Sequence, residues 1–320
     1  LEAHIDGLRI AGEPGWQICR EALELEEAGE VFAASVLAFE SGVAERLEQV
    51  FGVAAKNDEL CRAIISALGW LEWRQSKKYV QGLFELGAPE ASRLGLAAAA
   101  IHRQYPGRAL ASSLVSDDLS LRCRALQAAG ELGRTDLLFH VVGNLSAENV
   151  DLRYHAAWAT QLLGGEGAAS VLQTIAEGES EYAEQACAMA VRGMPPAKAH
   201  DWLKGLVGNK EWQRLAVLGA GVLGDPAVVP WLLELMAIPE LARPAGEAFS
   251  MITGVDLAYA DLEGPWPEGF SAGPTEEPED EDVEMDPDED LPWPAPELIA
   301  RWWDAHKGEF TRGARYLVGQ

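Results

Sequence analysis

The chain has 320 residues, of which 51 are Asp or Glu and 25 are Lys or Arg, so its formal net charge at pH 7 is −26. A charge of this sign and size argues against nucleic acid and an anionic membrane surface as partners. No apolar run reaches the roughly 20 residues that a membrane-spanning helix needs. Four cysteines, spread one to a predicted helix, are typical of small buried side chains in a reducing compartment, so we expect a cytoplasmic protein.

Residues 1–29 are predicted to form a helical lead-in. From residue 30 to 261 an Arg returns about every thirty residues, near the start of a helix rich in small side chains. These residues, which we call the Arg ladder, are Arg62, Arg93, Arg122, Arg153, Arg214 and Arg243. A fixed period of this length predicts a solenoid of stacked units. The predicted units are 30–58, 59–89, 90–117, 118–148, 149–179, 180–209, 210–239 and 240–261.

Each unit is predicted to be a helical hairpin. In the fourth unit, Asp117 or Asp118 is positioned to cap the first helix, and Gly133 ends it. In the fifth unit, Asp151 precedes the first helix and Gly164 ends it. Between these signals, Leu and Ala recur at helical spacing, which predicts an all-α fold.

Residues 262–297 form a segment of different composition. Between Glu276 and Asp290, eleven of fifteen residues are Asp or Glu, so this stretch carries −11 of the net charge. Such a segment is not expected to pack a core. Aromatic residues flank it and are predicted to pin it back onto the solenoid: Trp266, Phe270, Trp293, Trp302, Trp303 and Phe310. Residues 298–320 are predicted to be a C-terminal helix and tail.

The sequence of the repeats resembles HEAT-like repeats of the phycobilisome-lyase type. The consensus of such a repeat is Asp-x-x-(x)-Arg-x-x-Ala-x-x-Ala-Leu-Gly-x-Leu-Gly-Asp. The segments 122–133 and 214–225 match this pattern best, and the resemblance covers residues 30–255. It implies an all-α, right-handed superhelical solenoid of HEAT-like helical hairpins, with the acidic Pro-rich segment as an insertion near the C-terminus.

A second resemblance comes from the ends of the chain. The sequence is similar to a family of bacterial HEAT-repeat proteins often encoded beside type VI secretion genes. The segments that carry this resemblance are LEAHIDGLRIAG (1–12), GEVFAASVLAFESG (29–42), SALGWL (66–71), DLPWP (290–294) and GARYLVGQ (313–320). It implies a genomic association with secretion rather than a specific activity.

The Arg ladder has two interpretations. Each Arg stands near a carboxylate, such as Asp117, Asp118, Asp151 or Glu211, and is expected to tie one repeat to the next. The alternative is a row of cations that binds an anion. The spacing favours the structural interpretation, because opposite charges in successive layers satisfy one another.

Partner-binding residues are expected among exposed aromatics and acids, because Trp side chains are typical anchors of protein interfaces. The chain has eleven Trp. The residues that we select are Trp70, Trp73 and Tyr79 near a predicted hairpin turn, and Glu276, Glu277, Asp280 and Asp282 in the acidic segment.

No motif indicates catalysis, a cofactor or a metal. The six His lack zinc-ligand spacing, and the stretch 280–286 lacks the Gly and the closing Glu of a calcium loop. The pattern G-x-G-x-x-G occurs once, at Gly219, Gly221 and Gly224. These glycines fall within a predicted repeat helix, so we interpret them as residues that allow helices to pack closely rather than as a dinucleotide site. No catalytic, cofactor-binding or metal-binding residue is therefore assigned.

The favoured function is a non-enzymatic protein-binding scaffold, an accessory protein of a type VI secretion system acting in the cytoplasm. Its partner is expected to be a basic effector, adaptor or spike component, recognised through a negatively charged face. One alternative is an immunity protein that neutralises a secreted toxin. A second is a HEAT-like lyase or glycosylase-type enzyme. The glycosylase would need a basic groove, against which the net charge of −26 argues, and the lyase would need a tetrapyrrole pocket, which only a structure reveals.

Overall fold

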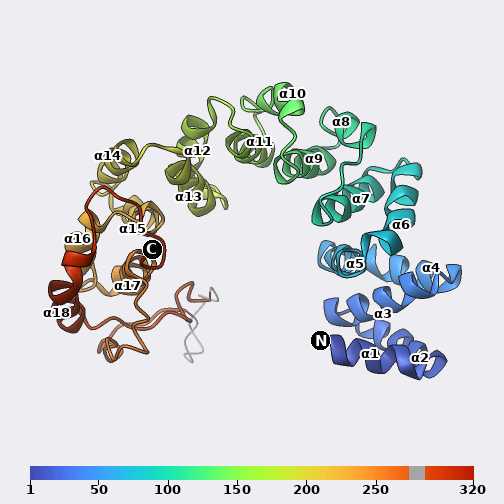
Figure 1. The fold of residues 1–320 in the computed structure, drawn as a ribbon, viewed down its shortest axis with the longest axis horizontal. Helices are drawn as coiled ribbons and strands as arrows, with labels where there is room; N and C mark the ends of the chain where they lie inside the picture. The colour runs from blue at the N-terminus through green and yellow to red at the C-terminus, as the bar shows by residue number, and fades with distance from the viewer. Residues whose placement is uncertain (274–284) are drawn as a thin grey trace. The chain divides into compact units, whose positions relative to one another are not determined.

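The computed structural model describes residues 1–273 and 285–320. In these residues all regular secondary structure is helical, apart from one isolated antiparallel bridge between Glu263 and Pro294. The predicted all-α class is therefore confirmed for the described residues. The chain divides into two compact units, 1–166 and 167–320 (Figure 1). None of the described helices is both long and apolar enough to cross a membrane.

Unit 1 consists of successive helix pairs. Its α-helices are α1 (Glu2–Ala11), α2 (Glu13–Ala22), α3 (Ala28–Ser41), α4 (Ala44–Ala54), α5 (Asp58–Trp70), α6 (Trp73–Glu85), α7 (Pro89–Ile101), α8 (Arg108–Ser113), α9 (Leu119–Glu131), α10 (Leu138–Val142) and α11 (Val150–Leu162). The short 3-10 helices η1 (Leu23–Leu25) and η2 (Thr135–Leu137) lie in the connections. The first helices α3, α5, α7, α9 and α11 each contact the next in this series. Residues 1–29, predicted as a lead-in, form the pair α1–α2, which packs on α3 through α2.

Unit 2 continues the same pattern. Its α-helices are α12 (Ala168–Ala176), α13 (Ala183–Gly193), α14 (Pro196–Leu206), α15 (Gln213–Leu223), α16 (Val229–Leu235), α17 (Pro239–Thr253) and α18 (Pro296–His306). Its 3-10 helices are η3 (Lys210–Trp212), η4 (Pro226–Val228) and η5 (Lys307–Glu309). Here the first helices are α13, α15 and α17, which contact one another in turn. The predicted unit 149–179 is divided between the two compact units, because α11 belongs to unit 1 and α12 to unit 2.

Helix ends follow the predicted signals, with one correction. Asp118 caps α9 by accepting a hydrogen bond from the Leu121 backbone N–H at 2.7 Å, and Gly133 has the left-handed φ of 63° expected after a helix. The cap of α11 is Asn149 rather than Asp151, because its amide oxygen accepts from the Leu152 N–H at 2.9 Å. Asp151 instead lies in the first turn of α11.

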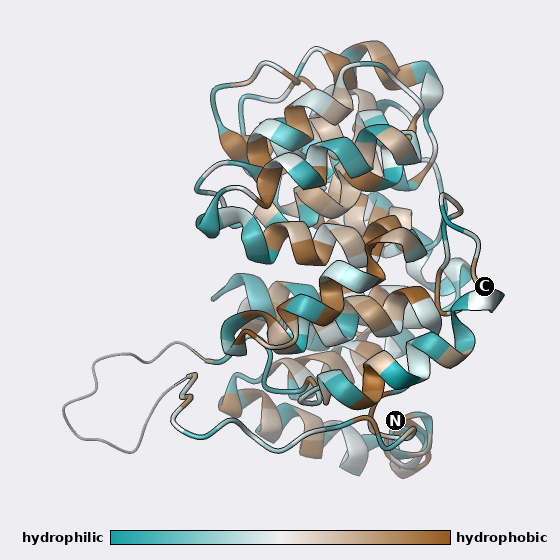
Figure 2. Ribbon diagram, turned by 90° about the vertical axis from the view of Figure 1, so that its left-hand side faces the viewer, coloured by the Kyte–Doolittle hydropathy of each residue, from teal (hydrophilic) through white to brown (hydrophobic). Residues whose placement is uncertain are grey.

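Small residues allow the first helices to approach closely. A Cβ atom on Gly130 of α9 would lie 2.7 Å from the Trp158 ring on α11, and one on Gly221 of α15 would lie 3.0 Å from the Ala248 Cα on α17. Contacts this short explain the preference for Ala and Gly on these helices, since a larger side chain would push the layers apart. In Figure 2 most helices carry both hydrophobic and hydrophilic residues, as amphipathic packing requires.

The last helix pair is interrupted by the acidic segment. Helix α18 packs on α16, and Trp302 and Trp303 contact the Phe249 ring of α17 edge-on, with ring centroids 5.6 and 6.3 Å apart. Ile299 of α18 is fully buried in the same core. Helix α18 thus acts as the second helix of the pair that α17 begins, and residues 254–295 are inserted between the two. The prediction that residues 240–261 form a complete hairpin is therefore wrong, because only α17 lies in this range and its partner α18 follows the insertion.

The C-terminal residues 313–320, which we call the strap, run across the ends of three first helices. Arg315 donates to the carbonyl oxygens of Val191 and Met194 at the end of α13. The backbone N–H of Tyr316 donates to the Gly224 carbonyl after α15, at 2.9 Å. Further along, residues 318 and 319 donate to the carbonyls of 251 and 252 in α17. The strap therefore satisfies carbonyl groups that a helix end leaves free.

Candidate functional site

The Arg ladder residues have different surroundings in the structure. Arg62 is exposed and has no ion-pair partner among the described residues. Arg93 pairs with Asp58 of the preceding repeat at 2.6 Å, which is the expected link between neighbours. Arg122 and Arg153 do not pair with Asp117, Asp118 or Asp151. Arg122 donates to Asn144 of its own repeat, whereas Arg153 donates to the carbonyls of Ala147 and Glu148, the last residues of the preceding unit 118–148.

Arg214 and Arg243 instead hold the acidic segment. The Arg214 guanidinium donates two parallel hydrogen bonds to the Asp288 carboxylate, at 2.7 and 2.8 Å, and this carboxylate raises the pKa of Arg214. Arg243 pairs with Asp286 at 2.7 Å and also donates to the Asp288 carbonyl at 2.9 Å. Arg214 also reaches Glu184 of the preceding first helix at 3.4 Å. The last two Arg of the ladder therefore bind the insertion, whereas Arg93 links neighbouring repeats.

Two tryptophans complete this arrangement. The Arg243 guanidinium lies 5.1 Å from the ring centroids of both Trp266 and Trp293, within cation–π range. Trp266 and Trp293 lie on the two limbs of the insertion, and the limbs are joined where the Gly264 N–H donates to the Trp293 carbonyl at 2.8 Å. We call Arg214, Arg243, Trp266, Trp293, Asp286 and Asp288 the Arg–Trp anchor.

The anchor is nearly closed to solvent at its centre. The side chains of Arg243 and Asp286 are 4% and 9% exposed. Burial disfavours the charged form of Asp286, but hydrogen bonds from the Asp288 backbone N–H and from Arg243 outweigh it and lower the pKa of Asp286. This carboxylate is therefore ionised at neutral pH and fixed in one position.

The anchor brings the two ends of the acidic stretch together. A Cβ atom on Gly273 would lie 3.0 Å from the Asp286 backbone nitrogen, so the chain leaves and returns at neighbouring points of unit 2. The predicted partner-binding residues Glu276, Glu277, Asp280 and Asp282 lie outside the described residues. Seven of the eleven residues 274–284 are Asp or Glu. The anchor uses Asp286 and Asp288 internally, whereas Glu289 and Asp290 are exposed.

The aromatic residues predicted to be exposed differ from one another. Trp70 is 40% exposed and contacts Phe32 edge-on. Trp73 and Tyr79 are half-buried, so the expectation of exposure is wrong for both. Trp73 packs against His102, and the Tyr79 hydroxyl donates to the Phe39 carbonyl at 2.6 Å. Both rings join neighbouring repeats of unit 1, because aromatic side chains fill gaps between helix layers well.

Comparisons with family models, with curated proteins and with solved structures find no match to this chain.

The described residues contain no group of three or more His, Cys, Asp or Glu that could hold a metal ion. Burial raises the pKa of the Cys123 thiol to about 11 and that of Cys187 to about 12, so neither is ionised at neutral pH. Gly219 and Gly221 sit in helix contacts, since a Cβ on Gly219 would lie 2.4 Å from Leu203. This geometry is that of helix packing rather than of a phosphate-binding turn.

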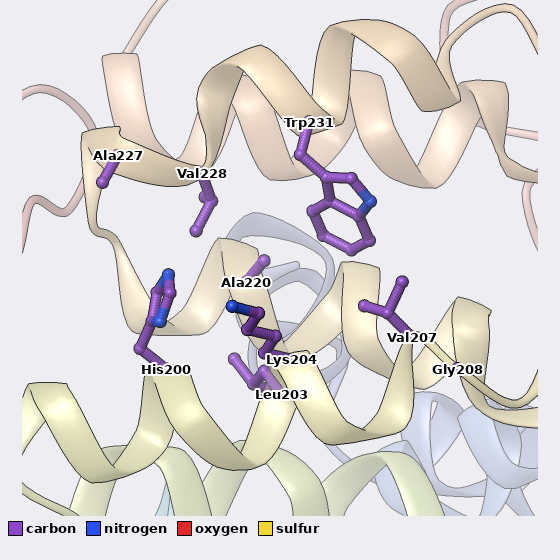
Figure 3. Close-up of a pocket in the computed structure, with 9 residues that line it drawn as sticks. All are labelled: His200, Leu203, Lys204, Val207, Gly208, Ala220, Ala227, Val228 and Trp231. Carbon is purple, nitrogen blue, oxygen red and sulfur yellow. The ribbon is translucent and has the colours of Figure 1, made fainter.

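A pocket opens between α14 and the η4–α16 segment, with α15 beneath it (Figure 3). Its volume is about 440 Å³. His200 and Lys204 of α14 and Trp231 of α16 face this space from opposite sides. Sequence reasoning did not select these residues, since a lone His and a lone Lys on a repeat helix carry no motif. The only available signal was their spacing of four residues on one helix.

Proposed function

We propose that this protein is a non-enzymatic scaffold that binds a basic protein through its acidic segment. The observation that supports the proposal most directly is the Arg–Trp anchor. It fixes both ends of a stretch in which seven of eleven residues are acidic. A polypeptide of net charge −26 would be expected to spread its charge by repulsion, yet here two cations of the repeat helices hold the insertion on unit 2.

The physical role of such a segment is to attract and select partners. Opposite charges speed diffusional encounter and reject partners of the wrong sign, more than they add affinity. The helix pairs are proposed to be HEAT-like and to form a right-handed solenoid that presents this segment.

The biological setting proposed is type VI secretion, with an effector, an adaptor or a spike component as the partner. This setting rests on the resemblance of segments 1–12, 29–42 and 313–320 to proteins encoded beside secretion genes. We further propose that the protein acts in the cytoplasm of the producing cell, before secretion.

The first test is capture of the partner from a secretion-active host, followed by kinetics with the purified complex. Four acids of the segment are neutralised together: Glu276→Gln, Glu277→Gln, Asp280→Asn and Asp282→Asn. The control neutralises four exposed acids of unit 1: Glu24→Gln, Glu45→Gln, Glu59→Gln and Glu85→Gln. Both variants change the net charge by the same amount, so only the position of the charge differs.

We expect the segment variant to slow association about tenfold at low salt and to flatten its salt dependence, because electrostatic steering is lost. The control is expected to change association less than about twofold. Equal effects of the two variants would mean that only total charge matters. Association unchanged in the segment variant would contradict the proposal, as would capture of no basic protein.

A further inference from the structure

The pocket between α14 and α16 lacks the acidic residues that line two other pockets of this chain. None of the nine residues that line it is acidic, although acids make up 51 of 320 residues. By contrast, the pocket at the start of α13 is lined by four glutamates: Glu177, Glu179, Glu184 and Glu211. The groove between α4 and α6 is lined by Glu48, Asp58 and Glu90. The α14–α16 pocket lacks this negative charge, as does the serine-lined pocket between α7 and α8, but of these two it alone is lined by a Lys and a His.

Its walls are apolar. Leu203 and Ala220 form the floor, while Val207, Val228 and Trp231 form the sides (Figure 3). Leu203, Ala220 and Val228 are themselves buried, so the pocket is formed by closely packed helices. The Trp231 ring offers a flat face for an aromatic or aliphatic group. A volume of about 440 Å³ falls within the range of about 300–1,000 Å³ typical of small-molecule sites.

Two nitrogen-bearing side chains enter this apolar space from one helix. His200 and Lys204 are one turn apart on α14, so both point to the same side. Among the described residues, neither has a hydrogen bond or an ion pair, and no carboxylate lines the pocket. Lys204 is exposed and His200 is half-buried, so water solvates the ammonium group and no counter-ion from the described part of the chain occupies the place of an anion. A carboxylate that reaches both nitrogens would replace this water with a charge-assisted hydrogen bond.

We propose that this pocket binds a small amphipathic anion, with its carboxylate on Lys204 and His200 and its apolar part against Trp231. The site is separate from the acidic segment and does not depend on the proposed protein partner. The net negative charge of the protein does not prevent such binding. Beyond about 8 Å that charge is screened at physiological ionic strength, whereas Lys204 would touch the ligand.

The test compares three probes with the same naphthalene ring: 1-naphthaleneacetate, 2-(1-naphthyl)ethanol and 1-naphthylmethylammonium. Binding to the full chain is measured by titration calorimetry, and ligand-observed NMR reports contact with the ring. Decanoate serves as a second anion, which distinguishes an aromatic from an aliphatic ligand. Lys204→Met removes the ammonium group but keeps the aliphatic stem. The matched control is Lys198→Met, on the same helix but outside the pocket lining.

We expect naphthaleneacetate to bind more tightly than the alcohol, and the ammonium probe to bind most weakly. Lys204→Met should weaken the acetate about fivefold, the upper range for an ion pair at an exposed side chain, while the alcohol changes less than about twofold. Lys198→Met should leave both unchanged. Trp231→Leu should weaken both probes, with an unchanged far-ultraviolet circular dichroism spectrum as evidence of folding.

Three results would overturn the proposal. One is the absence of saturable binding by either anion up to about 1 mM. Another is equal affinity for the anionic and the cationic probe, which would show that only apolar surface matters. The third is an equal effect of Lys204→Met and Lys198→Met, since the anion would then not be held by Lys204. Restored binding in Lys204→Arg would support the charge contact directly.

Discussion

Residues that look alike in the sequence differ widely in what they contact. All six Arg of the ladder occupy the same place in the repeat, yet Arg62 is exposed while Arg243 is 3% exposed and lies beside two tryptophans. The difference comes from residues more than forty positions away, Asp286 and Asp288. Period alone therefore identifies a structural position, but not the strength of the interaction made there.

The ladder gives a first prediction. Arg243→Met should lower the free energy of unfolding by about 3–5 kcal/mol, because it leaves Asp286 nearly buried without its cation. Arg62→Met, at the equivalent repeat position, should change it by less than about 0.5 kcal/mol. Urea denaturation of both variants checks this. Similar values for the two would mean that the Arg243 contact with Asp286 adds little to stability.

A second residue, His155, should make stability depend on pH. Burial, together with the Arg124 charge, lowers the pKa of His155 to about 4, although Asp151 opposes the shift. The unfolded chain, with a pKa near 6.5, binds the proton first. Stability should therefore fall as pH drops from about 6.5 to about 4, by about 2 kcal/mol for this half-buried ring.

His155→Gln removes the titrating group and should flatten this part of the pH profile. The free energy of unfolding is measured from pH 7.5 to 4.5 for the wild type and for His155→Gln. His4→Gln, at an exposed position, is the control and should keep the wild-type profile. A wild-type profile that keeps its slope in the His155 variant would assign the pH dependence to another group.

At the scale of elements, the strap contacts one of two glycines that follow first helices in the same backbone conformation. Gly224 and Gly133 both end first helices with positive φ, 74° and 63°. A Cβ on Gly224 would lie 2.2 Å from the Tyr316 carbonyl oxygen, whereas one on Gly133 would meet nothing within 4 Å. The two positions therefore share a backbone requirement but differ in the contact with the strap.

We predict that Gly133→Ala costs about 1 kcal/mol, the penalty of a left-handed backbone. Gly224→Ala should cost about 1–3 kcal/mol more, because the strap must move away and lose its hydrogen bonds. Thermal unfolding measures the difference, and exchange of the Tyr316 amide hydrogen should accelerate only in Gly224→Ala. Equal costs would show that the strap is easily displaced.

The sequence predicted most of these elements for clear physical reasons. Apolar periodicity and cap residues located the helix pairs, because both are local signals. It did not predict that α18 completes the pair begun by α17, since residues 254–295 lie between them. It predicted that Trp266 and Trp293 pin the insertion to the repeats, but not their contact with Arg243, because contacts across an insertion depend on where the chain returns. The α14–α16 pocket was missed for the same reason: His200 and Trp231 come from different repeats.

For the whole molecule, stability should behave as a sum of local contributions. In each unit, helices contact mainly their sequence neighbours, and the chain divides at residue 166 into two compact units. Native-state hydrogen exchange of Gly224→Ala should therefore show faster exchange in 167–320 and unchanged exchange in α3 and α5 of unit 1. Uniform acceleration over the whole chain would indicate a single cooperative transition.

The strap also has a consequence for how this protein can change in length. The Tyr316 N–H donates at the end of α15 and the Val318 N–H at the end of α17, two residues further along the strap. An extended residue covers about 3.3 Å and packed helices lie about 8–10 Å apart, so one more layer would need about three further residues. Duplication of a hairpin between α15 and α17 would therefore need a tail about three residues longer. Repeat number and tail length in this part of the chain are constrained to evolve together.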